Sequence, residues 1–137
     1  MNELIAKLEA APCGNSDMDA GIASYIGLRH RTRRDGYGRS KGREWFADSI
    51  GGVEEWSRQP PAYTTSLDAA MALVPQGWMI DQMGEWDAVP LRAMGPWFAI
   101  VRPRGPITGC IHTRADHHPT APLALCIAAL KAQKEKP

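Results

Sequence analysis

The chain has 137 residues, of which 44% are hydrophobic and 23% are charged, and its formal net charge is +1. This length and composition are typical of one globular domain with a buried core, and so small a net charge excludes a general attraction to nucleic acid or anionic membranes. The length predicts a single domain over residues 1–137. Because no apolar run reaches membrane-spanning length and no charged-then-apolar leader pattern occurs, we expect this domain in the cytoplasm, without membrane contact.

Two short helices are predicted at the start of the chain. Asn2 can cap the first helix, which ends at residues 12–14. Asn15 or Ser16 can cap the second, whose acidic first turn favours the positive end of a helix, and Gly27 closes it. Apolar residues recur at three- and four-residue spacing in both helices, which predicts one buried face on each.

Residues 29–43 form the most strongly biased segment of the chain. They include seven arginine or lysine residues against one aspartate, with glycines and a tyrosine between them. A basic, glycine-rich loop can contact phosphates and its tyrosine can stack on a base, so one interpretation is a nucleic-acid-binding loop. Its candidate binding residues are Arg29, Arg31, Arg33, Arg34, Tyr37, Arg39, Lys41 and Arg43. The alternative is a solvated insertion whose charge is offset by the acidic residues that follow.

Large aromatic residues and a proline pair follow this basic segment. Trp45, Phe46 and Trp56 are expected to anchor the segment to the core rather than to read bases. Pro60 and Pro61 make a stiff connection to the next element. The sequence therefore predicts one domain that carries a basic Gly/Arg-rich insertion or loop at about 29–61.

A helix is predicted in the middle of the chain and another near its C-terminus. Thr65, followed three residues later by Asp68, resembles a capping box, and the apolar residues that follow recur at helical spacing. Pro75 and Gly77 end this helix. Thr120 is the N-cap candidate of the later helix. We expect the two helices to cover one core.

Between these helices the pattern is typical of strands. Residues 97–102 are aromatic and β-branched with two apolar faces, which predicts a strand covered on both sides. Residues 78–83, 86–91 and 107–113 are further candidates, and Pro90 restricts the second of these to a sheet edge. Short links favour antiparallel pairing. The predicted class is α+β: a small antiparallel meander of three to four strands with helices on its faces, like an α/β/α sandwich.

Two stretches resemble a known family. Residues 65–78 read Thr-Ser-Leu-Asp-Ala-Ala-x-x-Leu-Val-Pro-x-Gly-Trp, and residues 122–130 read Pro-Leu-Ala-Leu-Cys-Ile-Ala-Ala-Leu. With the opening segments, they are similar to the small phage and prophage proteins of the phage ABA sandwich domain family. The resemblance implies a helix-covered sheet and a phage or prophage origin, but no activity or ligand. Over residues 29–62 and 84–119 it extends only to the order of the elements.

Metal-capable residues gather in one window near the C-terminus. The candidates are Cys110, His112, His117 and His118, with Asp116 between them. Their spacing matches no established ligand pattern, and a polar loop before the last helix accounts for the same residues, so we expect no metal site. A nucleophilic pair of Cys110 and His112 would need an orienting group that the sequence does not reveal. The three cysteines lack paired spacing, which predicts buried thiols rather than disulfides.

The motifs of common enzyme classes are missing from the sequence. It contains no Walker-type phosphate loop, no GxSxG elbow and no HExxH motif. We therefore expect a non-catalytic protein without a cofactor. The first hypothesis is an accessory or interaction module of phage type that binds a host or phage protein or a second copy of itself. The alternative is a nucleic-acid-binding accessory protein that uses residues 29–43.

Overall fold

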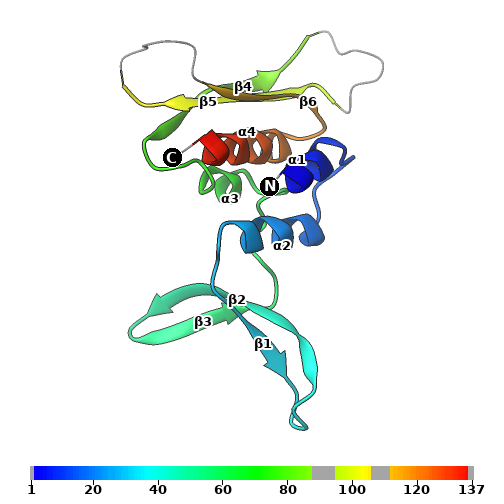
Figure 1. Ribbon diagram of the computed structural model, residues 1–137, viewed down its shortest axis with the longest axis vertical. Coiled ribbons are helices and arrows are strands. Elements are labelled where there is room, and N and C mark those ends of the chain that lie inside the picture. Colours follow the sequence, from blue (N-terminus) through cyan, green and yellow to red (C-terminus); the bar gives the residue numbers. More distant parts are fainter. Residues whose placement is uncertain (1, 88–94, 106–111, 136–137) are drawn as a thin grey trace.

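Figure 1 shows the computed structural model of the protein, which describes residues 2–87, 95–105 and 112–135. Its elements, in chain order, are α1 (Asn2–Glu9), α2 (Ser16–Tyr25), β1 (His30–Arg34), β2 (Ser40–Ile50), β3 (Val53–Ser57), α3 (Leu67–Met71), β4 (Trp78–Glu85), β5 (Trp97–Pro103), β6 (Thr113–His118) and α4 (Ala121–Glu135). The strands form two antiparallel three-stranded sheets, in the orders β1-β2-β3 and β4-β5-β6. The predicted α+β class is confirmed, and the predicted meander corresponds to β4, β5 and β6.

The elements are stacked in layers. In Figure 1 the β4-β5-β6 sheet is the outermost layer at the top, α4 lies beneath it, and α1 and α3 lie beyond α4. The helix α2 follows, and the β1-β2-β3 sheet projects away from it. The described helices all lie on one side of the β4-β5-β6 sheet, although the sequence predicted helices on both. On the opposite face of this sheet, the ring of Phe98 stacks on the ring of Trp86, with 4.4 Å between the ring centroids.

The last helix, α4, forms the centre of the core. Every residue from 123 to 130 is buried, as is Ala132. A helix that is apolar all round is surrounded by other elements, and α4 contacts all three strands of one sheet together with α1 and α3. Thr120 caps α4 as predicted, since its Oγ1 accepts a hydrogen bond from the Leu123 amide at 3.3 Å. This helix, rather than the predicted helix in the middle of the chain, organises the fold.

The middle helix, α3, is shorter than the sequence predicts and has a different cap. Ser66, not Thr65, is the N-cap, because its backbone is extended and its hydroxyl accepts from the Ala69 amide. Thr65 belongs to the preceding turn, where its amide donates to the carbonyl of Ala62 at 3.2 Å. The capping prediction was wrong by one residue because this turn is fixed by a distant contact.

That distant contact is a buried hydrogen-bond pair between α2 and the turn before α3. Asp19 Oδ1 accepts two bonds from Thr64, one from its amide at 2.8 Å and one from its hydroxyl at 2.7 Å. Gly14 allows the chain to approach, since a Cβ built there would lie 2.3 Å from the Thr64 carbonyl oxygen. The adjacent Tyr63 carbonyl accepts a hydrogen bond from the Cys126 thiol at 2.8 Å, which joins the turn to α4.

The strand predictions were correct for β4 and β5 and wrong for β6. Residues 113–118, expected to lie in a polar loop, form β6, whose Thr113 and Ala115 are buried and paired with β5. The outward-facing Arg114 and the charged residues after it hid this alternation in the sequence. The predicted strands at 86–91 and 107–113 fall largely on residues outside the described ranges. Within those ranges, no helix is long and apolar enough to cross a membrane.

Candidate nucleic-acid interface

Residues 29–57, which we call the arm, contain the β1-β2-β3 sheet. The long strand β2 pairs with β1 over its first half and with β3 over its second half, so the two hairpin turns lie at opposite ends of β2. Gly51 and Gly52 have φ values of 58° and 82°, as a two-residue hairpin requires. The segment predicted as a basic insertion or loop is thus largely strand, and Figure 1 shows it extending away from the helices.

One face of the arm attaches it to the rest of the protein. Trp45 is only 3% exposed and belongs to the hydrophobic core, and His30 meets its ring edge-on at a centroid distance of 5.3 Å. The expected anchoring role is therefore confirmed for Trp45. Phe46 and Trp56 lie on the other face, where their rings contact each other edge to face at 5.6 Å.

Two of the candidate arginines are engaged within the arm. The Arg29 guanidinium lies 4.6 Å from the Phe46 ring centroid and 3.1 Å from Glu54. The Arg31 guanidinium lies 4.2 Å from the Trp56 centroid and 2.9 Å from Glu44. Each cation is therefore neutralised by a carboxylate and stacked on an aromatic ring. These contacts stabilise the sheet and cover the aromatic face that could otherwise have stacked on bases.

The turn between β1 and β2 is built around Asp35. Its Oδ1 accepts from the amides of Tyr37 at 2.8 Å and Arg39 at 3.0 Å, and the Asp35 amide donates to the Arg39 carbonyl at 3.0 Å. Gly38 supplies the positive φ of 78° that reverses the chain. The Tyr37 side chain, which is 92% exposed, stands at the end of this turn. The turn is therefore ordered by its own hydrogen bonds while its aromatic residue faces solvent.

The other cations surround this turn, and we call residues 32–43 the tip. Arg33 and Arg34 donate to the backbone carbonyls of Lys41 and Gly38 at 3.1 and 3.0 Å. Within the described chain, neither forms an ion pair, and the same holds for Arg39 and Arg43. The tip thus carries five cations, namely Arg33, Arg34, Arg39, Lys41 and Arg43, against the single carboxylate of Asp35, which lies 3.9 Å from Lys41.

The predicted basic segment therefore divides into two parts with different roles. The structure brings together Arg33, Arg34, Tyr37, Arg39, Lys41 and Arg43 at the tip, and it assigns Arg29 and Arg31 to contacts inside the arm. Beside the Gly51-Gly52 turn, at the other end of the arm, two carboxylates are exposed: Glu55 and Glu54, which pairs with Arg29. The chain's net charge of +1 therefore conceals a concentration of cations at the tip.

The described part of the chain contains no group of three His, Cys, Asp or Glu side chains placed to hold a metal ion. His112 is exposed, whereas His118 is only 5% exposed on β6, and burial lowers the pKa of its imidazole. His117 lies 6.4 Å from the Trp86 ring. Cys110 lies outside the described residues.

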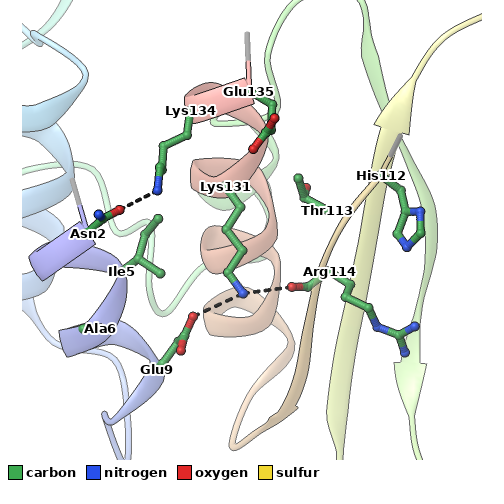
Figure 2. Close-up of a pocket in the computed structure, with 10 residues that line it drawn as sticks. All are labelled: Asn2, Ile5, Ala6, Glu9, His112, Thr113, Arg114, Lys131, Lys134 and Glu135. Carbon is green, nitrogen blue, oxygen red and sulfur yellow. Dashed lines mark hydrogen bonds and ion pairs between the residues drawn. The ribbon is translucent and has the colours of Figure 1, made fainter. Parts of the chain in front are cut away.

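A cavity of about 510 Å³ between α1, α4 and β6 is a second candidate, which the sequence did not suggest. Figure 2 shows Lys131 directed at Glu9 and Lys134 directed at Asn2, whereas the Arg114 side chain points away from both lysines. Lys131 Nζ lies 3.2 Å from Glu9 Oε1 and donates to the Arg114 carbonyl at 3.1 Å, and Lys134 donates to Asn2. Because these lysines fasten α1 and β6 to α4, they are less available to a ligand than the cations of the tip.

Comparison with known proteins found no relative of this chain. No family model matches the chain, and no similar curated protein or solved structure was found. The resemblance to the phage ABA sandwich domain family stays a prediction.

Proposed function

We propose that the protein is a nucleic-acid-binding accessory protein that contacts phosphates through the tip of its arm. The observation that carries this proposal is the group of four arginines around the exposed Tyr37 that have no carboxylate partner among the described side chains. Unpaired guanidiniums on a projecting hairpin are accessible to a large polyanion, and neutralising its phosphates releases counterions. The resemblance to phage proteins supports a phage or prophage setting for this function, in the bacterial cytoplasm.

The structure of the turn supports binding more strongly than a flexible basic loop would. Asp35 holds the turn through four hydrogen bonds, so the turn is already ordered in the free protein and binding a ligand costs less conformational entropy. The bonds from Arg33 and Arg34 to backbone carbonyls orient these side chains without removing their charge. The tip is therefore a preorganised cationic surface.

A second function, the binding of a protein strand or peptide, is favoured by a groove beside β4. Among the described strands β4 pairs only with β5, and a groove of about 540 Å³ lies along it. Its apolar lining includes Met71, which is 49% exposed, and Val74, Trp78 and Ile80. An unpaired strand beside apolar side chains can accept another strand, from a host or phage protein or from a second copy of this chain.

Salt-dependent binding distinguishes the two functions. The purified protein would be titrated into fluorescent single- and double-stranded nucleic acids at low and near-physiological salt. The test variant is Arg34→Ala/Arg43→Ala, and the matched control is Lys7→Ala/Arg58→Ala, which removes the same charge from exposed positions outside the tip. We expect binding that weakens as salt rises and falls about tenfold or more in the tip variant only. No binding at low salt, or equal losses in both variants, would refute nucleic-acid binding by the tip.

A further inference from the structure

Resting on the proposed function, we infer that the ligand of the tip is double-stranded DNA and that the tip enters its major groove. The tip is a two-stranded ribbon, because β3 pairs with β2 only from Trp45 onward and leaves residues 40–44 paired with β1 alone. The major groove of B-form DNA is about 12 Å wide and about 8.5 Å deep, and it admits a two-stranded ribbon. The four residues from Arg31 to Arg34 extend the ribbon by about 13 Å, which is enough to reach the groove floor.

The cations of the tip are distributed over both faces of the ribbon. Thr32 pairs with Arg43 and Arg34 pairs with Ser40, so Arg34 and Arg43 share one face. Side chains alternate along a strand, which puts Arg33 and Lys41 on the opposite face. A ribbon inside a groove has a phosphate backbone on each side, so it requires cations on both faces. A ribbon lying on a single strand would require them on one face only.

The aromatic residues of the arm argue against a single-stranded ligand. Single-strand binders commonly stack successive bases on exposed aromatic rings. Here Arg31 covers the Trp56 ring at 4.2 Å and Arg29 covers the Phe46 ring at 4.6 Å. Tyr37 remains as the exposed ring at the tip, and its place at the turn suits contact with base edges at the groove floor. Double-stranded RNA fits less well, because its major groove is deep and too narrow for such a ribbon.

A bulge shapes the ribbon between its two pairs of cations. Lys41 and Gly42 of β2 together oppose the single residue Arg33, and Gly42 has a φ of 107°. Such a bulge increases the local twist of the strands. The added twist rotates successive cationic side chains around the ribbon axis. The phosphates of a duplex likewise follow a helical path along both edges of the groove.

The test compares three ligands of one sequence: a 20-base-pair DNA duplex, its single strand and the corresponding RNA duplex. We expect the DNA duplex to bind roughly tenfold or more tightly than either of the others at the same salt. We also expect bound protein to protect guanine N7, which lies in the major groove, from methylation, and to leave adenine N3 in the minor groove reactive. Two double variants, Arg34→Ala/Arg43→Ala and Arg33→Ala/Lys41→Ala, remove one cationic face each, and both should weaken duplex binding by a similar factor.

The outcomes separate this inference from the proposed function. Equal binding of single-stranded DNA, or protection of adenine N3 alone, would overturn groove insertion while the tip still bound nucleic acid. Loss of affinity in only one of the two face variants would also overturn it. Arg34→Lys/Arg43→Lys keeps the charge that Arg34→Ala/Arg43→Ala removes, so restored affinity in the lysine variant shows that the alanine variant failed through charge and not through folding. Absence of binding to all three ligands would refute both proposals.

Discussion

The guanidinium carbon of Arg31 lies 4.2 Å from the centroid of the Trp56 ring, although 25 residues separate them, while its Nη2 lies 2.9 Å from Glu44. Arg31→Ala is therefore expected to loosen the arm by about 1 kcal/mol, which corresponds to roughly fivefold faster amide exchange in β1 and β3. Hydrogen-exchange mass spectrometry measures this directly. Arg39→Ala serves as the control and should leave exchange in both strands unchanged. Equal effects of the two substitutions would show that the stacked arginine does not hold the sheet.

Asp19 and Thr64 are expected to be among the most sensitive buried polar residues. Asp19→Ala leaves the buried amide of Thr64 without its acceptor and its hydroxyl with only the more distant Asn15 carbonyl at 3.3 Å, which should lower the free energy of unfolding by about 2 kcal/mol. Asp17→Ala, at an exposed position in the same first turn of α2, should cost less than about 1 kcal/mol. Urea denaturation of both variants compares them, and similar midpoints would contradict this role for Asp19.

Gly95 is needed because the chain passes very close to the end of β6. A Cβ at this position would lie 2.5 Å from the His118 carbonyl oxygen and 2.5 Å from Pro119 Cα. Both contacts involve backbone atoms, which cannot rotate away, so Gly95→Ala should destabilise the fold by about 1–3 kcal/mol. Gly36→Ala, where no atom lies within 4 Å of the added Cβ, is the control. Thermal unfolding that gives the same midpoint for both variants would disprove the close approach.

The buried imidazole of His118 should make stability depend on pH. Burial lowers its pKa in the folded state below the ordinary histidine value of 6.5, so the unfolded chain binds the proton more readily. The stabilisation from keeping this imidazole neutral is complete above pH 6.5 and is lost as the pH falls from there toward the folded-state pKa. The free energy of unfolding, measured from pH 8 to pH 5, should therefore decline less steeply in His118→Gln than in the wild type. His112→Gln, at an exposed position, should retain the wild-type slope.

The cysteines of the described chain should differ sharply in reactivity. The prediction of buried thiols was wrong for Cys13, which is exposed, and is confirmed for Cys126, which is buried in α4. Burial raises the pKa of the Cys126 thiol. The thiolate is the reactive form, so Cys126 should resist alkylation until the protein unfolds. Mass-spectrometric mapping after a short iodoacetamide treatment should find Cys13 modified and Cys126 intact. Rapid modification of Cys126 under native conditions would show that the turn before α3 opens readily.

Local signals in the sequence predicted much of the body of the fold. The caps at Asn15 and Thr120 depend on residues three positions away, and both are present in the structure. The strand at β5 is marked by its own aromatic and β-branched residues. By contrast, the cap of α3 could not be located, because Asp19, 45 residues before Thr64, fixes the turn that precedes it.

The arm was missed for a different physical reason. The strand β1 is exposed along nearly its whole length, so it lacks the apolar alternation that marks a half-buried strand. The sequence identified every cation of the tip, but it could not separate these from Arg29 and Arg31. Their engagement depends on Glu54 and Trp56, which only strand pairing brings within reach.

The central claim is that the tip neutralises phosphates, and the salt dependence of its affinity for a DNA duplex tests this most directly. With four phosphate contacts, a plot of log K against log salt concentration should have a slope of about −3 to −4. Arg34→Ala/Arg43→Ala should reduce the magnitude of that slope by about 2, and Lys7→Ala/Arg58→Ala should leave it unchanged. A slope near zero, or one that the tip variant does not alter, would contradict the claim.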